Sequence, residues 1–203
     1  MSLIGAAWIP GLPFVLKKEA SLEWTKLAEG MEELSRRLQE LKPDTIVLYS
    51  TQWFSVLGTS FQKRVHLEGV HIDENWYEWG DLPFKFSSDV ALSEKFESAV
   101  ANVGIPTKGI DYEEFPIDTG TIVANRFLNP QGKLPLSLVS SWVYATPEKS
   151  QLLGQTMRKT IEESGKRVFV VASSLLSTRF LQMKSIQSKI TFLMPRIQRG
   201  LKS

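Results

Sequence analysis

Apolar residues along this chain follow two different spacings, which predict strands alternating with helices. Short apolar runs that lack helical spacing predict buried strands, and these lie at residues 2–9, 45–49, 136–139 and 168–172, with further extended segments at 56–61 and from 105 onward. Stripes at three- and four-residue spacing predict amphipathic helices at residues 24–41, 89–104, 118–128 and 146–165.

The predicted helices begin and end at residues suited to those places. Asp89, Asp118 and Thr146 can cap helix starts, because their side-chain oxygens accept from free backbone N–H groups. Gly104 and Gly165 suit helix ends. In the same way, a proline at position 43 is expected to stop the first helix.

The order of these elements predicts one α/β domain, with a central, mostly parallel or mixed sheet flanked by helices on both faces. Residues 66–86 are too polar and too aromatic for a clean strand or a clean helix, so we expect a structured excursion there. No internal repeat or second domain is visible in the sequence.

Composition narrows the possible chemistry. The 203 residues are 42% hydrophobic and 23% charged, as in a globular domain, and no apolar run is long enough to cross a bilayer. The first residues lack the basic region of a signal peptide, so we expect a cytoplasmic protein with no membrane partner. Zero cysteines exclude disulfides and thiolate sites, and His66 and His71 are the only histidines.

Charge is unevenly distributed. All six charged residues after Thr178 are basic, so residues 1–178 hold 18 of the 24 basic residues against all 22 acidic ones, a net charge of −4. A basic end can bind nucleic acid, but no sequence motif of nucleic-acid readers accompanies it, and we expect no nucleic-acid partner.

Ligands of α/β sheets collect at the carboxyl ends of strands, which here directs attention to the loops after Ile9, Tyr49, Tyr112, Ser140 and Ala172. None of these loops supplies a recognisable catalytic set. The serines that follow the last strand have no Gly-x-Ser-x-Gly elbow around them, which argues against a serine hydrolase.

Three stretches carry a resemblance to a known family. They are residues 49–53 (Tyr-Ser-Thr-Gln-Trp), 68–82 and 115–122 (Phe-Pro-Ile-Asp-Thr-Gly-Thr-Ile). In order and spacing they resemble the class III extradiol ring-cleavage dioxygenases, and the likeness covers about residues 3–175. The resemblance implies that family's α/β fold and an aminophenol- or catechol-type aromatic substrate.

The same resemblance implies that the metal ligands are replaced. Catalytic subunits of the family carry a histidine in the first loop and another in a Pro-His-Trp motif, and these bind ferrous iron together with a later glutamate. Gly11 and Gln52 stand at the two histidine positions in this chain. Glycine offers no ligand, and a neutral amide oxygen is a poor one for ferrous iron. We therefore expect no catalytic residues and no metal in this chain.

What the resemblance implies is a non-catalytic structural or regulatory subunit. Its partner would be an iron-bearing catalytic homologue, with Fe(II) held by that partner and the two chains joined in a hetero-oligomer. Two alternatives stay open at this point: a stand-alone divergent member with another ligand-binding or enzymatic role, and a non-functional truncated product.

Further candidate residues have competing interpretations. His71, Asp73 and Glu74 could bind a metal, although a loop histidine is more often a hydrogen-bonded surface residue. Aromatic side chains between acidic residues could line a pocket, but they favour a subunit interface; these are Trp76, Tyr77, Trp79, Phe84 and Phe86.

Asp118 and Thr119 begin an Asp-Thr-Gly sequence of the kind found in aspartic proteases. Those enzymes need two such carboxylates that share a proton, and this chain has one copy of the motif in an α/β context. A helix N-cap is the favoured interpretation of Asp118.

The end of the chain departs from the family. We predict an incomplete dioxygenase-like domain at residues 1–178 and a divergent basic tail at 179–203. Codons exist for residues 177–190 that, read one base earlier, encode an acidic stretch of the kind the family resemblance leads one to expect, so a frameshift near Leu175 is one hypothesis. A truncated domain would expose apolar surface and aggregate.

Overall fold

The structure is a computed structural model that describes residues 2–17, 21–75, 77 and 80–174. Its first half contains β1 (Leu3–Ile9), the 3-10 helix η1 (Pro13–Leu16), α1 (Leu22–Leu41), β2 (Thr45–Ser55), β3 (Thr59–Gln62), β4 (His66–His71) and β5 (Leu82–Ser87). Its second half contains α2 (Val90–Asn102), β6 (Thr107–Ile110), α3 (Thr119–Leu128), β7 (Leu136–Trp142), α4 (Pro147–Ser164) and β8 (Val168–Ser173).

Six strands form the central sheet in the order β1-β8-β2-β7-β3-β6. The first four strands in this order run parallel to one another. β3 runs antiparallel to β7 and parallel to β6. The predicted α/β fold with a mixed, mostly parallel sheet is therefore confirmed. The carboxyl ends of β1, β8, β2 and β7 meet at one edge of the sheet.

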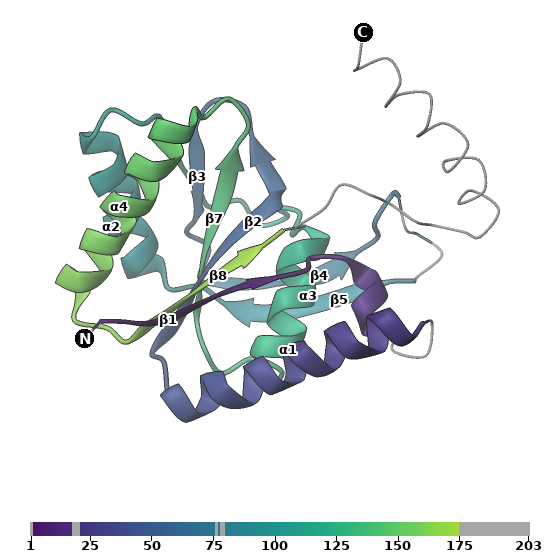
Figure 1. Ribbon diagram of the computed structural model, residues 1–203. Helices are drawn as coiled ribbons and strands as arrows, with labels where there is room; N and C mark the ends of the chain where they lie inside the picture. The colour runs from purple at the N-terminus through teal and green to yellow at the C-terminus, as the bar shows by residue number, and fades with distance from the viewer. Residues whose placement is uncertain (1, 18–20, 76, 78–79, 175–203) are drawn as a thin grey trace, which may run out of the picture.

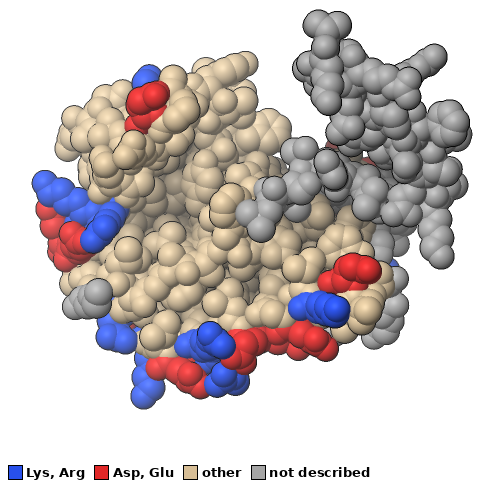
Figure 2. All heavy atoms as spheres, viewed as in Figure 1, with Lys and Arg blue, Asp and Glu red and all other residues tan. Residues whose placement is uncertain are grey.

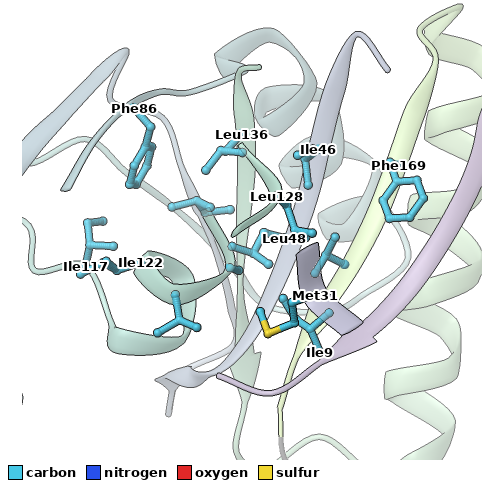
Figure 3. Close-up of a cluster of buried hydrophobic side chains, with 14 of the residues drawn as sticks. Ile9, Met31, Ile46, Leu48, Phe86, Ile117, Ile122, Leu128, Leu136 and Phe169 are labelled. Carbon is cyan, nitrogen blue, oxygen red and sulfur yellow. The ribbon is translucent and has the colours of Figure 1, made fainter. Parts of the chain in front are cut away.

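Helices cover both faces of this sheet, as Figure 1 shows. One face packs against α1 and α3 through a core that includes Met31, Leu38 and Ile122. Figure 3 shows this core, in which strand residues such as Leu48 meet the helices. The other face packs against α2 and α4 around Phe96. Each face buries one stripe of each covering helix, as the spacing of apolar residues predicts.

The capping residues act at the helix starts as the sequence predicts. Asp89 accepts a hydrogen bond from the backbone N–H of Leu92, and Asp118 accepts from that of Thr121. Thr146 does the same for α4, which ends at Gly165 in the left-handed conformation. The last residue of α1 is Leu41, and its C-cap Lys42 is also left-handed, with a φ of 48°. The helix has therefore stopped before Pro43.

Two predictions about local structure need correction. Residues 66–86 do lie outside the six-stranded sheet, as a structured excursion, but they contain regular strands, because β4 and β5 form an antiparallel hairpin across that segment. Its polar and aromatic residues obscured the alternation that a strand with one exposed face produces. Residues 56–61 form a strand only from Thr59 onward, since Val56 and Leu57 lie exposed in the preceding loop.

Charged side chains gather away from the middle of the face seen in Figure 2. Along α1, Glu33 accepts hydrogen bonds from Arg36 and Arg37 at 2.7 Å. Across the described ranges, no helix is long and apolar enough to cross a membrane.

Candidate functional site

The candidate site lies at a bulge in β2. Ser50 is the last residue of β2 that pairs with β8, where its partner is Ser173. Pairing of β2 with β7 skips from Ser50 to Phe54, while β7 advances by one residue from Ser140 to Ser141. The residues between bulge out of the ladder. This corrects the expectation that position 52 lies in a loop after a strand ending at Tyr49, since β2 runs on to Ser55.

Gln52 occupies this bulge, and both ends of its amide group are hydrogen-bonded. Its Nε2 donates to the carbonyl oxygen of Gly11 at 2.8 Å, and its Oε1 accepts from the backbone N–H of Gly120 at 2.8 Å. The side chain thus bridges the loop after β1 and the first turn of α3. The two positions at which the family resemblance expects histidines lie together in space, and a side-chain bridge joins them.

Packing at Gly11 is tight. A Cβ atom there would lie 2.5 Å from Ser173 Oγ and 3.0 Å from Gly120 Cα, with Gln52 Nε2 at 3.3 Å. A side chain at position 11 therefore requires the Ser173 hydroxyl to turn away and the backbone at Gly120 to shift slightly. Gly120 is confined in the same way, because a Cβ there would lie 2.8 Å from Ser173 Oγ.

Buried hydroxyl groups complete the network under Gln52. Ser50 Oγ donates to Asp118 Oδ1 at 2.6 Å, and Asp118 Oδ2 accepts from Thr121 Oγ1 at 2.7 Å. Ser173 Oγ donates to the carbonyl oxygen of Gly120 at 3.2 Å. The carboxylate of Asp118 thus caps α3 and fastens it to β2, which is a structural use of the Asp-Thr-Gly sequence.

His71, Asp73 and Thr119 form a second hydrogen-bonded group beside the first. His71 Nε2 lies 3.0 Å from Thr119 Oγ1, and the Thr119 hydroxyl also donates to the Asp73 carboxylate. His71 Nε2 lies 3.9 Å from Asp73 Oδ2. The hydroxyl of Thr119 is the hub of this group, which fastens the turn after β4 to the start of α3.

The donor set at this edge does not fit a ferrous iron. Gln52 uses both amide atoms in hydrogen bonds, Gly11 has no side chain, and the hydroxyls of Ser50 and Ser173 are bonded to protein atoms. The carboxylate of the network, Asp118, accepts hydrogen bonds at both oxygens. Within the described ranges, no three His, Asp or Glu side chains are grouped to hold a metal ion. Iron prefers imidazole and carboxylate ligands with open positions, and no such arrangement exists at this bulge.

The remaining predicted site residues that the structure describes take no part in these hydrogen bonds. Glu74 and Tyr77 are exposed, and Trp76 and Trp79 lie outside the described residues. Phe86 is buried in the core, and its ring centroid lies 6.0 Å from that of Phe84. Among the described members of the predicted aromatic set, Phe86 lies in the core and Tyr77 on the surface.

Sequence reasoning missed three residues of the network. Ser50, Ser173 and Gly120 lie in the quoted strand ends and in the Asp-Thr-Gly sequence, but nothing in their local pattern showed that they would meet. The parallel order of β8 and β2 brings the two serines side by side. Only the strand order, which a single sequence does not state, could have revealed this.

Comparison with known families gives one extensive match. A family model described as "Catalytic LigB subunit of aromatic ring-opening dioxygenase" matches residues 8–194. This match extends beyond residue 174, the last residue that the structure describes. Three predictions also lie outside the described residues: the domain boundary at 178, the tail at 179–203 and the frameshift.

Curated relatives include two subunits of one enzyme. The chain is 35% identical over 178 residues to the 2-aminophenol 1,6-dioxygenase alpha subunit of a Pseudomonas species, which covers 87% of this chain and 66% of the relative. It is 29% identical to the beta subunit, over 76% of this chain and 53% of that subunit. The Escherichia coli 3,4-dihydroxyphenylacetate 2,3-dioxygenase is 24% identical over 75% of this chain and 56% of its own. The chain spans about half to two thirds of these relatives.

A solved structure shares the fold. The uncharacterized protein JW3007 from Escherichia coli K12 superposes with a TM-score of 0.52 at 19% identity, over 71% of this chain and 54% of that one. A structural likeness at this level of sequence identity shows the fold alone.

Proposed function

This chain belongs to the LigB family of extradiol ring-cleavage dioxygenases, and from that premise we propose that it is a non-catalytic, alpha-type subunit that assembles with an iron-bearing homologue. The partner subunit holds the Fe(II) and cleaves an aminophenol- or catechol-type ring. This chain contributes structure or regulation to the complex.

The observation that carries the proposal is the amide bridge of Gln52. Gly11 and Gln52 stand at the two positions where the family resemblance places histidine ligands, and the amide of Gln52 links Gly11 to Gly120 by two hydrogen bonds, each 2.8 Å long. An amide used in this way has its oxygen engaged with the Gly120 N–H, and its nitrogen has no basic lone pair to offer a metal. The bridge therefore connects the loop after β1 to position 52 by a hydrogen bond, where a shared metal ion would otherwise connect them.

Restoring one ligand does not restore the centre. In Gln52→His the bridge is lost, while Gly11 still lacks a side chain and has no room for one beside Ser173 Oγ. The proposal therefore expects Gln52→His to bind no stoichiometric iron when purified without oxygen in the presence of Fe(II).

The choice of subunit type rests on the relatives. Similarity to the alpha subunit is higher and extends over more of this chain than similarity to the beta subunit. The chain spans only part of the length of each relative. The substrate type and the partner are therefore part of what we propose.

Ring cleavage by separate and combined chains tests this function. Each chain is expressed alone and together with a homologue that retains the two histidines, and oxygen uptake is measured with 2-aminophenol and with catechol in the presence of Fe(II). The proposal expects no turnover by this chain alone and oxygen-dependent cleavage by the combined chains. Turnover by this chain alone would overturn it.

A further inference from the structure

A hollow of about 210 Å³ lies between the hairpin and α3, away from the Gln52 bridge. Its walls come from β5, from the last turns of α3 and from the loop that follows, and include Phe84, Lys85, Ile122, Asn125, Arg126 and Gly132. Gly120 lies six residues before Arg126, which corresponds to about 9 Å along a helix. Ile122 lies closer to Gly120, but no side chain that lines the hollow takes part in the hydrogen bonds around Gln52 and Asp118.

Arg126 brings a positive charge to this hollow, and no acidic side chain among the described residues pairs with it. Its Nη2 donates to the carbonyl oxygen of Pro83 at 3.0 Å, which leaves most of the five guanidinium N–H groups for other acceptors. Burial lowers the pKa of Arg126 below its usual range, and no acidic group opposes that effect. None of the ion pairs between residues that the structure describes includes Arg126.

The hydrogen bonds around Asn125 leave its side-chain N–H groups as donors for a ligand. The backbone N–H of Leu134 donates to Asn129 Oδ1 at 3.0 Å, which fixes the orientation of that amide. Asn129 Nδ2 then donates to Asn125 Oδ1 at 3.0 Å, so the oxygen of Asn125 is already used. A contact between the Asn125 side chain and a ligand is therefore made through its N–H groups.

The rest of the wall is apolar or carries a second cation. Phe84 and Ile122 supply an aromatic and an aliphatic surface. Lys85 pairs with Glu68 at 2.7 Å, but its side chain is 77% exposed, so this pair is weak and can be exchanged. Gly132, with a φ of 63°, brings the loop close enough that an added Cβ would lie 3.7 Å from the carbonyl oxygen of Lys85.

We propose that this hollow binds a small organic carboxylate whose apolar body is a single ring or a short chain. The carboxylate accepts from Arg126 and Asn125, and the apolar body lies against Phe84 and Ile122. A guanidinium with free N–H groups suits the two oxygens of a carboxylate. The volume is below the roughly 300 Å³ of the smallest drug-sized sites, which limits the ligand to one ring. This inference does not depend on the proposed function.

An NMR titration of the full chain labelled with nitrogen-15 tests the site, with sodium benzoate as the probe. Benzyl alcohol has the same ring without the charge, and inorganic phosphate has charge without the ring. We expect saturable shifts with benzoate at the backbone amides of Phe84, Asn125 and Gly132, and affinities at least tenfold weaker for the other two probes. Shifts elsewhere, or equal affinity for either of the other probes, would overturn the proposal.

A pair of arginine variants tests the role of the charge. Arg126→Gln is expected to weaken benzoate binding at least tenfold, a loss of about 1.4 kcal/mol. Arg158→Gln is the matched control, because Arg158 is 69% exposed on α4 and pairs with Glu162. Unchanged binding by folded Arg126→Gln contradicts the site. If that variant does not fold, the map of shifts in the unmodified chain still decides the question.

Discussion

At the scale of single residues, Gln52 links three segments that are far apart in the sequence. Removing its side chain leaves the carbonyl of Gly11 and the N–H of Gly120 without these partners. We expect Gln52→Ala to lower the free energy of unfolding by about 1–3 kcal/mol, at about 0.5–1.5 kcal/mol for each hydrogen bond. Urea denaturation measures the change. Gln151→Ala, at an exposed position of α4, is the matched control and should change stability little; equal effects would refute the bridge.

Glu33 gives a pH-dependent prediction at the same scale. Hydrogen bonds from Arg36, and then from Arg37, lower the pKa of Glu33 from 4.5 to about 2. A carboxylate with a lowered pKa stabilises the fold above pH 4.5, and that contribution is lost as the pH falls toward about 2. Because Glu33 is on the surface, the effect is small and weakens with salt.

Carbon-13 NMR of the Glu33 carboxyl group measures this titration. We expect a midpoint near 2 in the unmodified chain and a midpoint closer to 4.5 in the double variant Arg36→Gln/Arg37→Gln. A midpoint near 4.5 in both proteins would show that the two arginines do not bind the carboxylate in solution.

At the scale of elements, α3 depends on Asp118. This carboxylate accepts hydrogen bonds from Thr121 N–H, Thr121 Oγ1 and Ser50 Oγ, so it caps α3 and also joins it to β2. We expect Asp118→Ala to cost about 2–4 kcal/mol, since an N-cap alone contributes about 1 kcal/mol and bonds to a charged group contribute more.

Two other variants separate these roles. Thr146→Ala removes only the cap of α4, where Thr146 Oγ1 accepts from Lys149 N–H at 3.3 Å, and should cost about 1 kcal/mol. Asp118→Asn keeps an acceptor and should cost less than Asp118→Ala. Thermal unfolding compares all three, and equal losses for Asp118→Ala and Thr146→Ala would mean that the joint to β2 contributes nothing.

The elements themselves were largely predictable from the sequence, because each has a local cause. The stripe of α1, the caps Asp89 and Asp118 and the apolar run of β8 are all visible within a few residues. The hairpin of β4 and β5 was missed because its alternation is broken by exposed apolar residues such as Val70. The Gln52 bridge was missed because it joins residues 41 and 68 positions apart, which only the strand order brings together.

At the scale of the whole molecule, β1 forms one border of the central sheet, and β8 is its only strand neighbour among the described residues. Its seven residues carry no charge and no proline, and Ala6 and Trp8 are exposed. Uncharged edge strands favour pairing with other chains. We therefore expect the isolated chain to self-associate as its concentration rises.

A lysine on this edge tests that expectation. Ala6→Lys should reduce self-association in light scattering, because a charged edge resists strand pairing. Ala101→Lys makes the same charge change at an exposed position of α2 and should leave self-association close to that of the unmodified chain. A similar reduction by both variants would indicate that net charge, and not the edge of β1, is responsible.

The central claim is that this chain is a partner of a catalytic subunit. The most direct test is the mass of the species that forms when it is co-expressed with an iron-bearing, beta-type homologue. Size-exclusion chromatography with multi-angle light scattering should show both chains in one stable hetero-oligomer, with iron in proportion to the homologue alone. Elution of the two chains as separate species, or iron in proportion to both chains, would contradict the claim.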